Sequence, residues 1–271
     1  MAFDREYFNL GYLDMLSYKD TFVHRLDPRA KLFAVAAFVV IVVSFPKDAV
    51  SGMAPLFFFP VLLALAGDIP PSLIVRRVLL VSPFAIGVGV FNPLLDRGAA
   101  IDLWGLPVSG GWLSFASLMI KFTLTVSAAL LLIATTSFPE VCRALQRLGL
   151  PEIFVTQLLF LYRYVFVLMD ETMKMVRARD MRSFGDRGRG IASFIPLAGV
   201  LFIRSLERAE RLHRAMLSRG FDGRIRSLRQ RSLTAVDVLA AISVTAVFVV
   251  MRKVNLAVLI GNLLIGRIGG S

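Results

Sequence analysis

Five apolar segments leave this sequence few ways to fold. They cover residues 32–45, 54–66, 78–91, 113–136 and 235–251. The chain of 271 residues is 56% hydrophobic and only 18% charged, whereas soluble domains carry about 25% charged residues. Too little polar sequence is present to cover five such segments in water, and a lipid bilayer needs no such cover. We therefore predict an all-α integral membrane protein with about five transmembrane helices.

The positive charge of the chain is concentrated in one region. Of the net charge of +12, residues 171–231 hold 15 Lys/Arg against 6 Asp/Glu, a surplus of +9. In membrane proteins such basic regions stay on the cytoplasmic side. The shorter loops alternate in the same sense, because the N-terminal segment and the loop with Arg76 and Arg77 are basic, whereas the first and third loops are not. We therefore predict a cytoplasmic N-terminus and a cytoplasmic region after the fourth span.

Residues 153–169 form a sixth apolar run whose flanking charges conflict with a membrane crossing. Arg143 and Arg147 precede it and the basic region follows it, so a single crossing would leave one basic side outside. We expect the run to lie along the membrane interface or to pack beneath the spans. The alternative is a hairpin of residues 153–169 with residues 191–203.

Helix start and stop signals divide the chain into three parts. Capping boxes at residues 137–140 and 234–237 begin a short helix and the last span, and glycines interrupt the sequence between them. Two long helices are expected at residues 152–183 and 191–219, about 48 and 44 Å long at ~1.5 Å per residue. The predicted parts are 1–136, with four spans, 137–231, a cytoplasmic module of long coupling helices, and 232–271, the last span and tail. The role of residues 254–265 stays open.

The second long helix is amphipathic. Phe202, Leu206, His213 and Met216 fall on one face, and its arginines fall on the opposite face. The first long helix has a similar apolar stripe. Two helices with such facing stripes can pack or cross as a pair, and we expect His213 to be a packing residue.

The two long helices run toward matched tripeptides 40 residues apart. They are Ala178-Arg179-Asp180 and Ser218-Arg219-Gly220. An arginine at this position can simply complement the negative end of the helix dipole, for about 0.3–1 kcal/mol. It can also enter a pocket of a partner and pair with a carboxylate there. The duplication of the motif favours the second interpretation.

With these motifs the chain resembles the transmembrane T component of energy-coupling factor transporters, in particular the cobalt type (CbiQ-like). The order of spans, cytoplasmic helices and last span matches over nearly the whole chain. The segment containing Leu26, Asp27, Pro28, Arg29 and Lys31 resembles the N-terminal motif of that family. Its paired Ala-Arg-Gly coupling motifs correspond to the two tripeptides. The sequence departs from them at Asp180, where glycine is usual, and at Ser218, where alanine is usual, and a carboxylate at 180 could compete for Arg179.

The resemblance implies a non-catalytic subunit of an ATP-driven uptake system, most directly for cobalt. In that family the coupling helices dock into two ATP-binding-cassette ATPase subunits and act on a separate substrate-binding membrane subunit. The resemblance also implies a bacterial or archaeal inner (plasma) membrane and no cofactor on this chain, with ATP and Mg on the ATPases. In agreement, the glycine-rich stretch 185–190 lacks the Lys-Ser/Thr of a phosphate loop and is interpreted as a turn.

Several other functions were weighed. A T component for nickel or a vitamin is the nearest alternative. A self-contained channel or carrier would need charges inside its spans, and only Lys121 lies well within an apolar run, near an end from which it can snorkel. We expect no catalytic or metal site, since His24 and His213 lie outside the spans. Nucleic-acid binding is not expected, because the arginine face lacks interleaved aromatic residues.

Small residues are expected to permit close contacts between the spans. Gly87, Gly89, Ala128 and Ala129 are the candidates, and a lipid-facing position would explain each equally well.

Overall fold

The computed structural model describes residues 16–46, 50–95, 101–103, 106–108, 110–182, 191–223, 225 and 234–253. These residues fall into two compact units. The membrane unit takes its residues from Asp14–Ser137 and Arg231–Ser271, and the basic unit takes its residues from Phe138–Gln230. The turn expected at 185–190 and the apolar stretch 254–265 lie outside the described residues.

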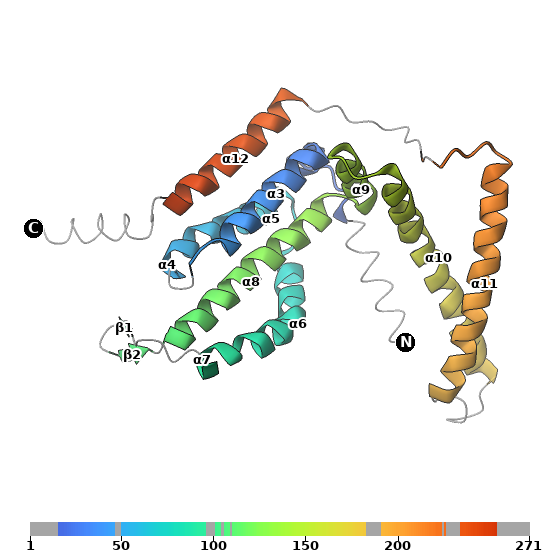
Figure 1. Cartoon of the computed structure of the whole chain (residues 1–271), viewed down its shortest axis with the longest axis horizontal. Helices are drawn as coiled ribbons and strands as arrows, with labels where there is room; N and C mark the ends of the chain where they lie inside the picture. Colours follow the sequence, from blue (N-terminus) through green and yellow to red (C-terminus); the bar gives the residue numbers. More distant parts are fainter. Residues whose placement is uncertain are drawn as a thin grey trace, which may run out of the picture. The chain divides into compact units, whose positions relative to one another are not determined.

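The membrane unit is built around the helix α3 (Pro28–Val43). α3 packs against α8 (Gly110–Thr135) and against α12 (Ala235–Lys253), and the three helices run alongside one another (Figure 1). The other elements are α2 (Phe22–Arg25), α4 (Val50–Met53), the 3-10 helix η1 (Ala54–Phe57), α5 (Phe58–Ala66), α6 (Pro71–Gly89), α7 (Phe91–Leu95), β1 (Ile101–Leu103) and β2 (Leu106–Val108). α6 and α7 both contact α8, so α8 links them to the centre of the unit.

A buried apolar cluster holds these helices together. Phe38 of α3 and Leu124 of α8 are both fully buried in it. The rings of Phe38, Phe59 and Phe248 lie 4.6–5.1 Å apart between centroids, in tilted or edge-on pairs. Such aromatic pairs add about 0.5–1.5 kcal/mol beyond their buried area. The three rings join α3, α5 and α12, which come from opposite ends of the chain.

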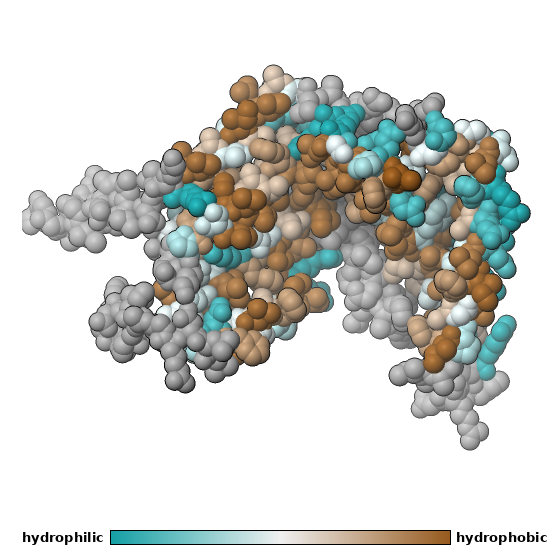
Figure 2. Space-filling model, in the orientation of Figure 1, coloured by the Kyte–Doolittle hydropathy of each residue, from teal (hydrophilic) through white to brown (hydrophobic). Residues whose placement is uncertain are grey.

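The structure confirms an all-α integral membrane protein. Among the described residues, four helices are long and apolar enough to cross a bilayer: Pro71–Pro93, Gly110–Thr135, Glu152–Arg182 and Ala235–Arg252. Hydrophobic residues cover much of the visible face of the membrane unit (Figure 2). The strands β1 and β2 form a small antiparallel hairpin in which Ile101 pairs with Val108, a local exception to the helical architecture.

Three of the five predicted spans coincide with helices of sufficient length, and two helices are shorter. Ala54–Ala66 is an apolar helix below the length of a span, and α3 has 16 residues. The long helix at Glu152–Arg182 contains the run whose flanking charges conflict with a crossing. Length and composition alone place it among the four, so its position along the interface stays a prediction.

The start of α3 differs from the predicted span at residue 32. The Asp27 side chain accepts the backbone N–H of Arg29 at 2.9 Å, and Pro28 occupies the first helical position. An aspartate cap followed by proline is a strong helix start. The helix therefore begins four residues before the apolar run, and it includes Arg29 and Lys31.

The basic unit consists of α9 (Phe138–Arg147), α10 (Glu152–Arg182) and α11 (Ile191–Leu217). These helices begin and end within two residues of the expected positions. Gly149 has a φ of +109° just after α9, a left-handed conformation that glycine adopts without strain. Phe138 at the start of α9 stacks on Tyr162 of α10, with ring centroids 4.9 Å apart, which fixes α9 against α10.

Candidate coupling site

The helices α10 and α11 pack side by side in opposite directions. Near the middle of the pair, Arg204 Nη1 donates to Glu171 Oε1 at 2.8 Å. At one end, the Thr156 hydroxyl donates to the carbonyl of Gly223 at 3.2 Å. Thr156 belongs to the first turns of α10, and Gly223 follows the end of α11. The segment that follows α11 therefore reaches back to the start of α10, so the two helices run in opposite directions (Figure 1).

This direction places the two predicted coupling arginines at opposite ends of the helix pair. Arg219 follows α11 close to Phe221, whose ring lies 6.1 Å from that of Phe160 in α10. Arg179 lies in the last turn of α10, at the other end. α11 has 27 residues, so at 1.5 Å per residue the two ends are about 40 Å apart. Two arginines at this separation cannot enter one pocket.

The tip that contains Arg219, here called the second tip, is a helix stop with a free arginine. The N–H of Phe221 donates to the Met216 carbonyl and the N–H of Gly220 to the Leu217 carbonyl, both at 3.0 Å. Gly220 has a φ of +77°. This is the Schellman arrangement, in which a left-handed glycine ends the helix. It leaves the Arg219 side chain exposed.

The tip that contains Arg179, the first tip, has a different structure. α10 continues through Asp180 to Arg182, so residue 180 is helical and needs no glycine. The Asp180 carboxylate accepts hydrogen bonds from Nε and Nη2 of Arg179, at 3.2 and 3.0 Å. The Arg179 side chain is only 24% exposed. The expected competition for Arg179 is therefore present within the motif itself.

The other motif residues lie as the helix ends require. Ala178 is half-buried in the last turn of α10, and Ser218 is exposed. The Ser218 hydroxyl donates to the carbonyl of Arg214 at 2.9 Å. A hydroxyl at this position forms an extra bond to the last turn of α11, which alanine could not form.

The expectation that α10 and α11 pack through their apolar stripes is wrong. A small polar cavity of about 270 Å³ between the helices is lined by Arg204, Ser205 and Arg208 of α11 and by Glu171 of α10. The apolar residues Phe202 and Leu206 are 63% and 51% exposed instead. The ion pair of Arg204 with Glu171 bridges the two helices on the polar side of α11, and the apolar residues Phe202 and Leu206 are left outward.

His213 is exposed with that outward face, so it is not the packing residue that the sequence suggested. His213 lies on the same face of α11 as Phe202 and Leu206, and this face is turned away from α10.

The second predicted motif, at residues 26–31, lies in the membrane unit and joins helix ends there. Asp27 caps α3, and its own backbone N–H donates to Asp237 Oδ1 at 3.2 Å. The other carboxylate oxygen of Asp237 accepts from the hydroxyl and the N–H of Thr234, at the start of α12. One buried carboxylate therefore ties the starts of α3 and α12. The capping role predicted for Asp237 is confirmed, and its bond to Asp27 is additional.

Lys31 has a corresponding role at two helix C-termini. Its Nζ donates to the Thr135 carbonyl at 2.9 Å and to the His24 carbonyl at 3.4 Å. Thr135 ends α8, and His24 lies in the last turn of α2. Helix ends leave carbonyls without partners, and a cation there complements the helix dipole. Lys31 is only 7% exposed, so its charge is directed into the unit.

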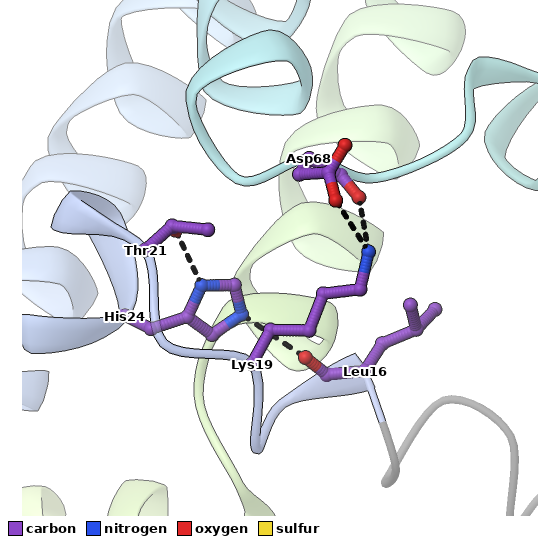
Figure 3. Close-up of polar contacts among 5 residues, drawn as sticks. All are labelled: Leu16, Lys19, Thr21, His24 and Asp68. Carbon is purple, nitrogen blue, oxygen red and sulfur yellow. Dashed lines mark hydrogen bonds and ion pairs between the residues drawn. The ribbon is translucent and has the colours of Figure 1, made fainter.

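A third set of contacts fixes the segment before α2 (Figure 3). His24 Nδ1 lies 2.7 Å from the Thr21 hydroxyl and Nε2 lies 3.1 Å from the Leu16 carbonyl. Lys19 Nζ donates to the carboxylate and to the carbonyl of Asp68, at 2.8 and 2.7 Å. Burial, followed by the nearby charge of Lys31, lowers the pKa of His24 below its usual 6.5. The neutral imidazole therefore donates from Nε2 and accepts at Nδ1.

Lys121 reaches the end of a neighbouring helix. Its Nζ donates to the carbonyls of Phe45 and Val43 at the end of α3. Arg252 Nη2 lies 3.4 Å from the Ser44 carbonyl at the same end. The lysine in the fourth apolar segment is therefore occupied as a helix cap. No sequence signal linked these residues, because they meet only after α3, α8 and α12 have packed.

Of the two motifs, the structure thus places one in each unit. The N-terminal motif residues from Leu26 to Lys31 organise the membrane unit, where Pro28 is buried and Leu26 is half-buried. The two tripeptides end the long helices of the basic unit. Among the described residues, no group of three or more His, Cys, Asp or Glu side chains is placed to hold a metal ion.

These features define a multi-pass helical membrane protein with an arginine-tipped pair of amphipathic helices. The model of the family CbiQ, described as cobalt transport protein, matches residues 19–231. The chain therefore belongs to the CbiQ family.

Curated relatives extend the similarity over most of the chain. The chain is 27% identical over 246 residues to the energy-coupling factor transporter transmembrane protein EcfT of Ruminiclostridium cellulolyticum, covering 84% of this chain and 91% of that protein. It is 29% identical over 232 residues to EcfT of Listeria innocua, covering 78% and 87%. It is 27% identical over 259 residues to EcfT of Lactococcus lactis, covering 87% and 96%. The family match at residues 19–231 includes parts of both units.

Proposed function

We propose that this protein is the transmembrane coupling subunit of an ATP-driven energy-coupling factor transporter, and that it catalyses no reaction itself. The observation that carries the proposal is the placement of Arg179 and Arg219 at opposite ends of the antiparallel pair α10–α11. The ends are about 40 Å apart, so each arginine reaches a different binding surface. This arrangement fits two ATP-binding-cassette ATPase subunits that are held by one chain.

Each tip has the chemistry of a docking point. A guanidinium pairs with a carboxylate through two parallel hydrogen bonds, and arginines are frequent hot spots of protein interfaces. Arg219 is exposed at a rigid helix stop, so it loses little freedom on binding. Arg179 has first to leave Asp180. The names of the EcfT relatives place such chains in energy-coupling factor transporters, which supports this reading of the tips.

The exposed apolar face of α11 fits the third partner, a substrate-binding membrane subunit. Phe202 and Leu206 are large, exposed apolar side chains of α11, and so are Ile195 and Ile203. A contiguous apolar face of this kind indicates an interaction surface. Movement of the ATPases at the two tips would be transmitted along α10 and α11 to this face.

Cobalt is the substrate that we propose for the complete transporter, on the strength of the family. Nickel or a vitamin would need the same coupling chain, since the substrate would be held by the separate subunit. A self-contained carrier is less well supported, because Lys121, the candidate charge within a span, caps α3.

The proposal is tested by co-purification of the ATPases with the full-length chain. The double variant Arg179→Glu/Arg219→Glu reverses both tips, whereas the control Arg211→Glu reverses an exposed α11 arginine that pairs with Glu207. We expect the double variant to lose the ATPases and the control to retain them. Retention by the double variant at wild-type strength would refute docking through the tips. Substrate uptake by the purified chain alone in liposomes would support the carrier instead.

A further inference from the structure

The membrane unit contains an apolar cavity of about 400 Å³. It is lined by α2, α3, α5, α8 and α12, and only Lys31, Thr135 and Asp237 among its 17 lining residues have polar side chains. Its volume is in the range of ligand pockets, about 300–1,000 Å³. Alanines on α3, α5 and α12 leave the space open: Ala30, Ala34, Ala66, Ala240 and Ala241.

The cavity is polar at one end and apolar along its length. Thr135 ends α8 and Asp237 lies in the first turn of α12, so the polar residues mark the ends of the helices. From Asp237 the lining continues along α12 to Val244, about 10 Å at 1.5 Å per residue. Lys31 and Asp237 are already occupied by helix ends. The occupant therefore needs to supply apolar surface, not a partner for these charges.

Two lining residues show where the cavity opens. Phe22 and Leu62 are 71% and 46% exposed, so the cavity reaches the surface beside them. A transmembrane helix is 10–12 Å across, and one turn of it fills about 400 Å³. The cavity is thus far too small for a partner helix. Its apolar lining suits an acyl chain, which gains about 0.8 kcal/mol for each buried methylene.

Positive charges lie next to the polar end. Arg29 neighbours the lining residue Ala30 in the sequence, whereas Arg25, beside Leu26, is already paired with Asp20. The Arg29 Nε atom is buried without a hydrogen-bond partner in the structure, and the nearest carboxylate oxygen, on Asp27, is 4.0 Å away. The rest of the Arg29 side chain is 23% exposed, so its guanidinium can still pair with a phosphate oxygen at the rim of the cavity. Basic residues at the level of the headgroups attract anionic lipids.

From these observations we propose that the cavity is a phospholipid site, in which one acyl chain of an anionic phospholipid lies between α3, α5 and α12. The phosphate lies at the end marked by Arg29. The lipid fills a gap between helices from the two ends of the chain. It therefore stabilises the packing of α12 on α3, and it does so whether or not the chain binds ATPases.

The test uses the full-length protein in vesicles that contain phosphatidylglycerol with a diazirine on its acyl chain. After illumination, we expect adducts at lining residues such as Leu62 and Leu132, at least tenfold above those at the exposed α6 residues Leu79 and Leu80. Equal labelling of all four positions would overturn the proposal. The same probe with a choline headgroup is expected to label the cavity about threefold less, and equal labelling would overturn the role of the phosphate.

Cavity-filling variants provide the matched comparison. Ala34→Leu/Ala240→Leu is expected to lower the cavity adducts about tenfold, whereas Ala129→Leu, on the exposed side of α8 and outside the cavity, is expected to leave them unchanged. Unchanged labelling in the filled variant would refute the site. A photoreactive residue at position 62 that links to a protein instead of to lipid in cell membranes would also refute it.

Discussion

The two units of the molecule use their charged residues in opposite ways. In the membrane unit Lys31, Asp27 and Asp237 are buried and hold helix ends together. In the basic unit the charged residues lie at the surface of a helix pair, and one of the tip arginines is exposed. Charge in the first unit therefore maintains the fold, whereas charge in the second is available to partners. Substitutions in the two units should separate stability from binding.

The largest expected effect is on binding, from reversal of a single tip. Arg219→Glu is expected to weaken ATPase binding by about 3 kcal/mol, or roughly 100-fold, because it leaves the partner carboxylate unpaired. Arg179→Glu should cost less, by up to about 1 kcal/mol, because Asp180 already occupies this guanidinium in the free chain. Titration of nanodisc-embedded protein with ATPases measures both, and the unfolding temperature should not change.

The variant Asp180→Gly provides the control for this asymmetry. It removes the competing carboxylate, and we expect binding at the first tip to strengthen up to about fivefold. Equal losses for the two arginine variants, together with no gain for Asp180→Gly, would show that the tips are equivalent.

The largest expected effect on stability comes from Lys31→Met. The carbonyls of Thr135 and His24 would remain buried without a donor, at about 1–3 kcal/mol for each unsatisfied group. Lys19→Met is the matched control, because the Lys19–Asp68 pair is exposed and contributes about 0–1 kcal/mol. Thermal unfolding in detergent measures the difference. A similar loss of stability for both lysine variants would contradict the conclusion that buried charges hold the helix ends of this unit together.

A smaller loss of stability is expected from glycine substitutions on α6. A Cβ at Gly89 would lie 2.8 Å from Phe115 Cδ2 in α8, whereas a Cβ at Gly87 would meet nothing within 4 Å. Overpacking typically costs about 1–3 kcal/mol, so Gly89→Ala should lower the unfolding temperature and Gly87→Ala should leave it unchanged or raise it. A lower unfolding temperature for Gly87→Ala than for Gly89→Ala would contradict the close contact of Gly89 with α8.

The smallest effect is a pH dependence of the segment before α2. The pKa of His24 is lowered by burial and by Lys31, so the unfolded state binds its proton more readily than the folded state. Stability is therefore complete above pH 6.5 and is lost as the pH falls from 6.5 toward the lower folded pKa. Protease cleavage near Leu16 should become faster in that range. His24→Gln should remove the dependence, and an unchanged pH profile in this variant would exclude His24 as its origin.

The sequence predicted the features that depend on local chemistry. Capping residues and glycines placed the ends of α9, α10 and α11 within two residues, because a cap acts within one helical turn. The membrane class followed from the apolar segments. The competition of Asp180 for Arg179 could also be predicted, since the two residues are neighbours.

Features that depend on distant residues were not predictable. Asp27 and Asp237 are 210 residues apart in the sequence, and no local pattern joins them. The carbonyls that Lys121 binds were not predicted, because the end of α3 was not known to lie beside it. The face of α11 that contacts α10 was predicted wrongly. Amphipathic periodicity identifies an apolar face, but it does not show what that face contacts. Here that face of α11 is exposed, and the ion pair of Arg204 with Glu171 lies between the two helices.

Site-specific cross-linking tests most directly whether the two tips hold two different ATPase molecules. A photoreactive residue replaces Met181 next to the first tip or Leu217 next to the second, both of which are exposed, in the complete transporter. Each single variant should give an adduct with one ATPase, and the double variant should link two ATPase subunits to one chain. A double variant that links only one ATPase, or adducts at only one tip, would contradict the account.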